Sequence, residues 1–169
     1  MLGAGTDAAG RVVAIYIAPV AAAPVVSLRE SAALAGRGLA GDRYAKQIGY
    51  YSNHPHYPPS GRHLTLIAAE GLERLARETG IALHSGEHRR NIVTRGVDLT
   101  ALLGRRFRVG EVTCIGIRPC PPCAHLEQLA RQGVLRGLAH DGGVRAEILS
   151  GGVMRVGDAV TLEDEKERP

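Results

Sequence analysis

Phe107-Arg108-Val109-Gly110-Glu111-Val112 is the stretch that decides the fold, because it begins a strand pair that continues through Ile115-Gly116-Ile117. The next residues, 118 to 123, contain three prolines, which forbid regular strand or helix and predict a rigid loop. A helix from about His125 to Gln132 follows, and Gly133 caps it. The unit is therefore two strands, a stiff loop and a helix.

Further short strands are predicted around this unit. Apolar, β-branched runs bounded by turn residues mark them at 11–17, 25–28, 64–67, 91–94, 144–149 and 153–162. A helix covers 68–79, with Leu72, Leu75 and Ala76 on one face and Gly80 after its end. The 22 glycines and 9 prolines imply frequent turns. We predict a mainly β (α+β) fold, a closed or partly closed β-barrel of about seven strands with two or three peripheral helices.

Length and composition indicate a single domain of 169 residues. We expect 1–33 to form an N-terminal strand and connection within that domain, 34–162 its main part, and 163–169 a charged tail. The net charge of +4 is too small, and base-stacking aromatic residues too scarce, to indicate a nucleic-acid partner. No apolar run reaches about 18 residues, so we expect no membrane span. No export signal is recognisable, so we expect a cytoplasmic protein with reduced thiols.

The strongest candidate for chemistry is Arg118-Pro119-Cys120-Pro121-Pro122-Cys123-Ala124-His125-Leu126. Cys123 falls just before the predicted helix, where the positive end of the helix dipole favours a thiolate. A thiolate serves nucleophilic attack, persulfide carriage and ligation of a soft metal. The alternative is a pair of small hydrophobic cysteines in a packed corner, and Cys114, within a strand, is expected in the core.

The spacing of Cys120 and Cys123 also suggests a zinc-binding structural module or thioredoxin-like exchange. Structural zinc needs four ligands, and the remaining candidates, His125 among them, are dispersed along the chain. Thioredoxin-like exchange needs the pair at a helix start in a βαβ unit, which the predicted strand order does not supply. Both alternatives rank below a single working thiol.

Two further clusters suit an anionic ligand. In Gly41-Asp42-Arg43, glycine permits close backbone approach, Asp42 can orient a ring N–H or cap a turn, and Arg43 can clamp an oxyanion. In His88-Arg89-Arg90-Asn91, adjacent arginines beside an amide suit a phosphate or carboxylate. Solvated side chains are the alternative interpretation of both. The Tyr-rich and Pro-rich segment 50–61 predicts a surface loop that is flexible unless something ties it down.

In this order and spacing, these pieces resemble the MOSC domain, named for the C-terminal domain of molybdenum-cofactor sulfurase. The resemblance runs from about Leu34 to Leu162. The matching elements are Gly41-Asp42-Arg43, Arg90-Asn91-Ile92, Gly96-Val97-Asp98-Leu99, Leu103-Gly104 before Phe107, Pro122-Cys123-Ala124-His125-Leu126, and Gly151-Gly152 to Val156-Gly157-Asp158. The resemblance implies a β-barrel with helical decorations and one functional cysteine, which falls on Cys123.

The resemblance also implies a function. Cys123 would ligate molybdenum of a pterin cofactor (molybdopterin), in a protein that reduces N-hydroxylated or similar small substrates. Alternatively, Cys123 would carry a persulfide from a donor protein to a metallo-enzyme, and Cys120 would resolve that persulfide or merely pack. The residues that would line the cofactor cleft are Asp42, Arg43, Arg90, Asn91 and His125. The family commonly has His after Gly-Asp-Arg, whereas this chain has Tyr44, so an ionisable partner is missing there.

Overall fold

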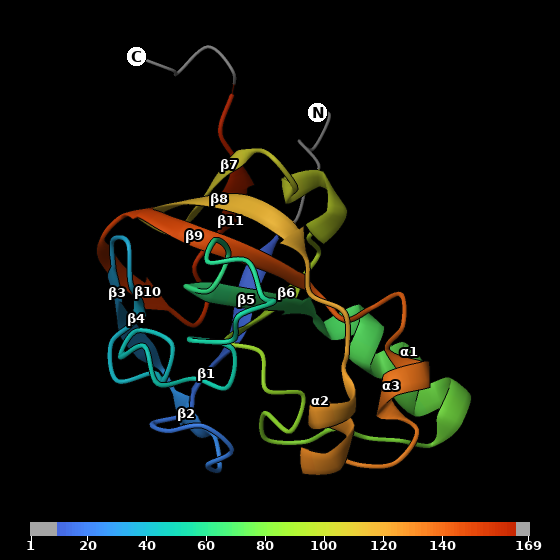
Figure 1. Ribbon diagram of the computed structural model, residues 1–169. Coiled ribbons are helices and arrows are strands. Elements are labelled where there is room, and N and C mark those ends of the chain that lie inside the picture. The colour runs from blue at the N-terminus through green and yellow to red at the C-terminus, as the bar shows by residue number, and fades with distance from the viewer. Residues whose placement is uncertain (1–9, 165–169) are drawn as a thin grey trace, which may run out of the picture.

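The computed structural model describes residues 10–164, which form two sheets with the three α-helices gathered on one side (Figure 1). The larger sheet has eight strands in the spatial order β11 (Val160–Leu162), β7 (Arg106–Val109), β8 (Val112–Pro119), β9 (Val144–Ser150), β5 (Leu64–Ala68), β6 (Ile92–Arg95), β1 (Arg11–Ile17) and β2 (Val26–Leu28). The smaller sheet has the order β10 (Gly152–Arg155), β3 (Glu30–Leu34) and β4 (Gly38–Leu39). The helices are α1 (Ala69–Thr79), α2 (Ala124–Leu129), α3 (Val134–Gly137) and the 3-10 helix η1 (Leu99–Leu102).

Local sequence explains the central elements. In β7, Phe107 and Val109 are buried while the arginines that alternate with them are exposed, as expected of a strand with one face on the core. α1 ends at Gly80, which has a φ of 75° and donates its N–H to the carbonyl of Ala76. β5 and β6 pair in parallel, with α1 as their crossover, and the other strand pairs of the larger sheet are antiparallel.

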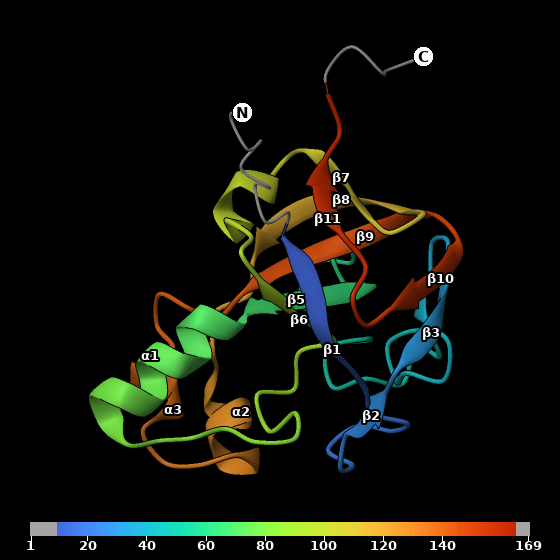
Figure 2. The same cartoon turned by 180° about the vertical axis from the view of Figure 1, so that it is seen from behind.

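Two apolar clusters hold the elements together. The main one lies between the two sheets, and Ile15, Phe107 and Met154 are completely buried in it. The second lies between one face of β5 and β6 and the three α-helices, with Ile67 and Leu138 at its centre. Figure 2 shows the helices on one side of β5 and β6, away from the smaller sheet. The region where the helices meet the larger sheet is where the cysteine loop lies.

The mainly-sheet α+β class and the number of helices are confirmed. The predicted β-barrel is not confirmed, because no strand ladder closes the larger sheet. β1 and the residues just before β11 are joined only by an isolated bridge between Arg11 and Ala159 and by single hydrogen bonds, such as Val12 N–H to the Asp158 carbonyl at 2.9 Å. Among residues 10–164, no helix is long and apolar enough to cross a membrane.

The structure differs from the sequence prediction in its short elements. The stretch predicted as one bent strand, 153–162, forms two strands in different sheets. Gly157 adopts a φ of 97°, and Asp158 accepts the N–H of Arg155 at 2.8 Å, so the chain turns away from the first sheet there. The strands β3 and β4 and the single-turn helix α3 were not predicted. Most of the predicted tail, 165–169, lies outside the described residues.

Candidate functional site

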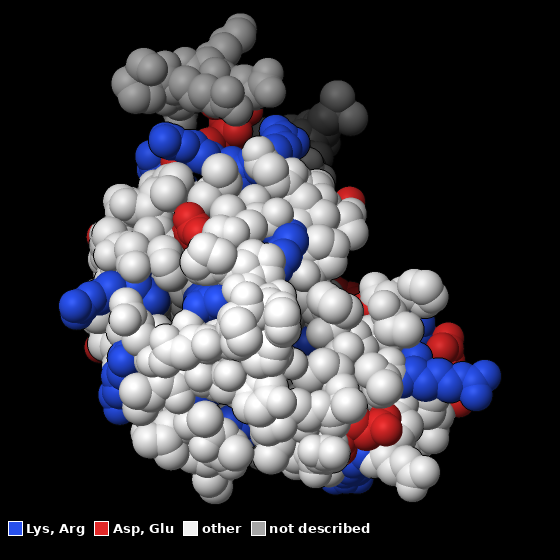
Figure 3. Space-filling view, in the orientation of Figure 1, with Lys and Arg blue, Asp and Glu red and all other residues white. Residues whose placement is uncertain are grey.

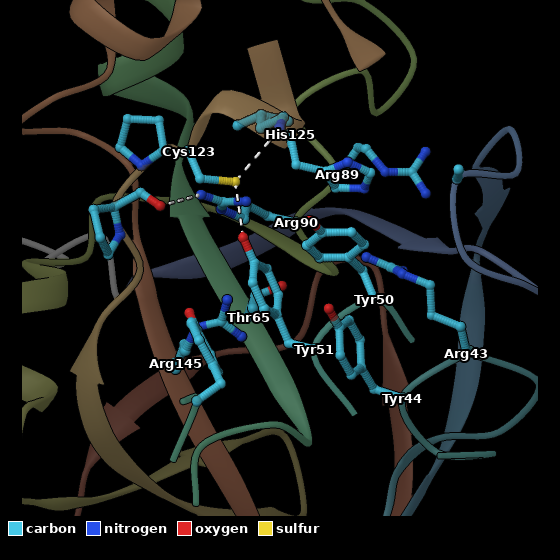
Figure 4. A pocket seen from close by; sticks show the side chains of 15 residues that line it. Arg43, Tyr44, Tyr50, Tyr51, Thr65, Arg89, Arg90, Cys123, His125 and Arg145 are labelled. Carbon is cyan, nitrogen blue, oxygen red and sulfur yellow. Dashed lines mark hydrogen bonds between the residues drawn. The ribbon is translucent and has the colours of Figure 1, made fainter. Parts of the chain in front are cut away.

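A cleft of about 170 Å³ opens where the cysteine loop, the 50–61 loop, β5 and β9 meet (Figure 4). Its lining combines one thiol with arginines and tyrosines. The lining residues are Ala22, Arg43, Tyr44, Tyr50, Tyr51, Tyr57, Thr65, Arg89, Arg90, Pro121, Pro122, Cys123, His125, Leu126 and Arg145.

Arg90 fixes the shape of the cysteine loop. It follows β5 and α1 in the chain and precedes β6, and its side chain reaches across to the loop that leaves β8. Its Nε donates to the carbonyl of Gly142 at 2.9 Å, and its Nη2 donates to those of Cys120 at 3.0 Å and Pro121 at 3.3 Å. The loop also passes close to Gly142, where a Cβ would lie 2.4 Å from the Cys120 carbonyl oxygen. Arginine and glycine together therefore hold the loop that carries the thiol.

Cys123 is the cap of α2, and its sulfur faces the cleft. Sγ accepts the N–H of Leu126 at 3.4 Å and the hydroxyl of Tyr51 at 3.2 Å (Figure 4). Cys123 is partly exposed, whereas Cys114 and Cys120 are completely buried. Burial raises the pKa of Cys114 to about 12, as expected for a core thiol. Of the three cysteines, only Cys123 is open to a ligand.

The 50–61 loop supplies an aromatic wall. Tyr51 stacks on Tyr57 with 4.2 Å between ring centroids, and Tyr50 stacks on His125 with 3.9 Å. Arg62 holds the loop by donating to the carbonyls of Tyr57 at 2.6 Å, Pro58 at 2.9 Å and Ser52. This clamp is what ties down the segment that the sequence predicts to be flexible.

Burial and the contact with Cys123 both raise the pKa of Tyr51 above its ordinary value of 10.0. Its hydroxyl therefore keeps its proton at neutral pH and acts as a donor to Sγ. The pKa of His125 is lowered by burial and by the charges of Arg89 and Arg43. Its imidazole is therefore neutral at pH 7.

The cleft is strongly cationic. Of the described residues, four arginines line it and no carboxylate does. Arg43 is paired with the buried Asp42 at 3.2 Å, and Arg90 is occupied by backbone carbonyls. Arg89 donates from Nη1 to the Ala23 carbonyl at 2.7 Å, but its Nη2 is buried without a hydrogen-bond partner. Burial and the charge of Arg43 lower the pKa of Arg89.

Arg145 is the most deeply buried of the four arginines. It is 6% exposed, and its Nε is buried without a hydrogen-bond partner among residues 10–164. Its guanidinium carbon lies 5.2 Å from the Tyr57 ring centroid and 5.9 Å from that of Tyr51. Burial acts to lower its pKa, but nearby Cys120 and the tyrosines outweigh that effect, and the pKa is raised. Arg145 thus stays charged beside the cleft.

The structure brings together four of the residues singled out from sequence: Cys123, Arg43, Arg90 and His125 all line the cleft. The other three do not line it. Asp42 is completely buried and accepts the N–H of Ala18 at 2.9 Å. Asn91 exchanges hydrogen bonds with Thr65 and donates to the Tyr16 carbonyl. Cys120 is completely buried. Their roles toward a ligand stay predictions.

Sequence reasoning missed Arg145 and the three tyrosines of the 50–61 loop. The tyrosine-rich composition of the loop was a signal for an aromatic wall, but nothing local indicated which site it would face. Arg145 reaches the cleft because β9 pairs with β5 and sets Arg145 directly opposite Thr65. Such a long-range pairing has no local sequence signal.

The described residues thus form a mainly-sheet α+β domain with a single open thiol in an arginine-lined cleft. The sequence model of the MOSC domain matches residues 52–161, which is more than half of the chain. The chain therefore belongs to the MOSC domain family, and the resemblance noted from its motifs is confirmed.

Solved structures of low sequence identity share the fold. The YuaD protein from Bacillus subtilis aligns with a TM-score of 0.68 at 17% identity, over 90% of this chain and 94% of that chain. YiiM from Escherichia coli aligns with a TM-score of 0.63 at 17% identity, over 92% of this chain and 70% of that chain. A search of the curated proteins finds no match.

Proposed function

We propose that this protein binds a molybdenum–pterin cofactor through Cys123 Sγ and acts in the reduction of N-hydroxylated or similar small substrates. The observation that carries the proposal is the composition of the cleft. Among the residues described, it presents one thiol and four guanidinium groups and no carboxylate. Membership of the MOSC family, which is associated with this cofactor, supports the proposal.

The residues present fit such a group. A thiolate is a ligand for soft metals, and guanidinium groups match the geometry of a phosphate. The buried Nη2 of Arg89 and Nε of Arg145 lack partners that an anionic ligand would supply. No group of three or more His, Cys, Asp or Glu side chains suited to a metal ion occurs among residues 10–164. A metal held here therefore has to bring most of its ligands, as a pterin dithiolene does, and the zinc alternative has no ligand set in the described residues.

The cofactor, when bound, would supply two-electron redox chemistry. The chain's own residues would position the substrate and move protons. Replacing an N–O bond by N–H releases water and consumes protons. The Tyr51 hydroxyl, 3.2 Å from Sγ, keeps its own proton and would hold the sulfur by a hydrogen bond. The neutral imidazole of His125, stacked on Tyr50, can accept or donate a proton at the same cleft. The stacked rings also limit the access of water to the sulfur.

Metal and pterin analysis tests this proposal. Wild type, Cys123→Ala and Cys120→Ala are purified in parallel from a molybdenum-replete host. Molybdenum and pterin are expected in wild type and in Cys120→Ala, which keeps the ligand, and to be lost from Cys123→Ala. Wild type without molybdenum or pterin, or equal content in Cys123→Ala, contradicts the proposal.

A second candidate function is persulfide carriage on the same sulfur, from a sulfur-donor protein to an acceptor metallo-enzyme. It is favoured by the two donors, Leu126 N–H and Tyr51 O–H, that converge on Sγ and suit an anionic sulfur. Exposure to a cysteine desulfurase with cysteine is expected to add about 32 Da to the intact mass. The gain should disappear in Cys123→Ser, and an unchanged mass of the wild type counts against this role.

A further inference from the structure

We infer that Cys123 accepts sulfane sulfur from an anionic donor of the thiosulfate class, whose oxyanion end is held by Arg145 in a cleft that Arg89 makes more cationic. This inference rests on the persulfide-carrier candidate above and adds the chemistry of a small-molecule donor. Three features of the cleft carry it: an unpaired buried cation, a second arginine with a free donor, and a sulfur surrounded by hydrogen-bond donors.

Arg145 is the first feature. At 6% exposure it has little contact with water, its Nε has no hydrogen-bond partner in the described chain, and no carboxylate lies within ion-pair distance there. Burying a guanidinium without an anionic partner costs free energy, and an anion that accepts hydrogen bonds from its N–H groups offsets that cost. Figure 4 shows Arg145 directed toward the tyrosines beside the Cys123 sulfur. The guanidinium is thus placed to meet a ligand of the thiol.

Arg89 is the second feature. Its Nη2 is buried without a partner, while its neighbour Arg43 already binds Asp42. Arg89, Arg43 and His125 lie close enough for the two arginines to disfavour further positive charge on the histidine. An anion placed among these groups would relieve their mutual repulsion, whereas a neutral ligand would not. The positive charges of the cleft therefore favour a negatively charged sulfur donor over a neutral one.

The sulfur is the third feature, and it defines the reaction. The Cys123 thiolate attacks the sulfane sulfur of thiosulfate, and a bond forms between Sγ and that sulfur. The bond between the two sulfurs of thiosulfate breaks, and sulfite leaves with its electron pair. The product is a persulfide anion on Cys123, the total charge is unchanged, and no other oxidant or reductant takes part. Leu126 N–H and Tyr51 O–H, which contact Sγ, would stabilise the new anion.

The test uses reduced protein with thiosulfate as the donor. Its two readouts are the intact mass of the protein and the amount of sulfite released. Wild type should gain about 32 Da and release one sulfite per persulfide, and Cys123→Ser should do neither. Arg145→Gln should slow the gain about 10- to 100-fold, the range for a lost charge-assisted hydrogen bond, and Arg89→Gln should slow it less, because its charge acts over a longer distance. Arg136→Gln, an exposed arginine outside the cleft, is the matched control and should react like wild type.

One measurement needs no variant. Iodoacetate and iodoacetamide both alkylate thiolates but differ in charge and in intrinsic rate. Relative to a free model thiol, wild-type Cys123 should therefore favour the anionic reagent, and sulfate should suppress that preference. A second arm supplies sulfur from a cysteine desulfurase. Labelling by the desulfurase but not by thiosulfate overturns the anionic donor and leaves the carrier role. Labelling by neither overturns both. Equal thiosulfate rates in wild type, Arg145→Gln and Arg89→Gln, or no preference for iodoacetate, overturn the recognition by arginine.

Discussion

Arg90 and Arg145 are buried to nearly the same extent, 8% and 6% exposed, yet we predict opposite consequences of replacing each by Met. Arg90 donates three hydrogen bonds of 2.9, 3.0 and 3.3 Å to backbone carbonyls of the cysteine loop and of Gly142. Each is worth about 1–1.5 kcal/mol net, and its loss leaves a buried carbonyl unpaired. Arg90→Met should therefore lower the free energy of unfolding by about 3–5 kcal/mol.

Arg145 makes no such bond from its Nε and contacts two tyrosine rings instead. Each cation–π contact contributes about 0.5–1 kcal/mol, and the removal of an unpaired buried charge offsets that loss. Arg145→Met should therefore change the free energy of unfolding by less than about 1 kcal/mol in either direction. A residue that contributes nothing to stability while it stays charged and buried is expected at a binding site rather than in a scaffold.

The assay is urea unfolding of both variants and of wild type, with the exposed Arg136→Met as control. The free energies are comparable only if the slopes of all four proteins agree, which checks that the transition remains two-state. The reasoning is refuted if Arg90→Met costs less than about 1 kcal/mol, or if Arg145→Met costs as much as Arg90→Met. The second outcome would mean that Arg145 has structural partners and is not reserved for a ligand.

Three further predictions concern single positions. Gly143 has a φ of 99° and its Cβ would lie 2.0 Å from a backbone carbonyl oxygen, so Gly143→Ala should abolish soluble expression or lower the melting temperature by more than 10 °C, about 2.5 kcal/mol or more. Burial and, to a lesser extent, the charge of Arg90 lower the pKa of His88 from 6.5 to about 3. Between these pH values the unfolded chain binds a proton at His88 and the folded chain does not. Stability should fall as the pH falls from about 6.5 toward 3, by up to about 1.4 kcal/mol per pH unit, and His88→Asn should flatten that slope in urea titrations. Tyr51→Phe removes a donor to Sγ and should slow alkylation of Cys123 by iodoacetamide about tenfold at pH 7, while equal rates in the two proteins would contradict the contact.

The fold was predictable where local signals are strong. The run 11–17 is β1 to the residue, and the helix that ends at Gly80 was placed within one residue, because a left-handed glycine stops it. The strands β3 and β4 escaped prediction because Ser-Ala-Ala and a Gly-Leu pair have weak strand preference. β3 is ordered by pairing with β10, and β4 by pairing with β3. The split of the last predicted strand depends on that same second sheet.

The candidate site was predictable as far as its cysteine. The prolines, the predicted helix start and the resemblance to the MOSC domain together pointed to Cys123, and the structure makes it the cap of α2. The basic clusters gave Arg43 and Arg90, but not that Arg90 is used by the backbone. Arg145 comes from a strand paired far along the chain, so its place beside the thiol follows from sheet register, which local patterns do not encode.

The hydrogen bonds that join Val12 to Gly157 and Asp158 connect segments that lie far apart in the chain and therefore leave the ribosome at different times. The cleft has the same property, since its lining runs from Ala22 to Arg145. Contacts so distant in sequence form late and slowly. While the chain is being made, the Cys123 thiol is therefore without its complete set of arginines, and any ligand that needs them can be loaded only onto finished protein. Until that moment the thiol has to be protected from oxidation by the reducing conditions around the nascent chain.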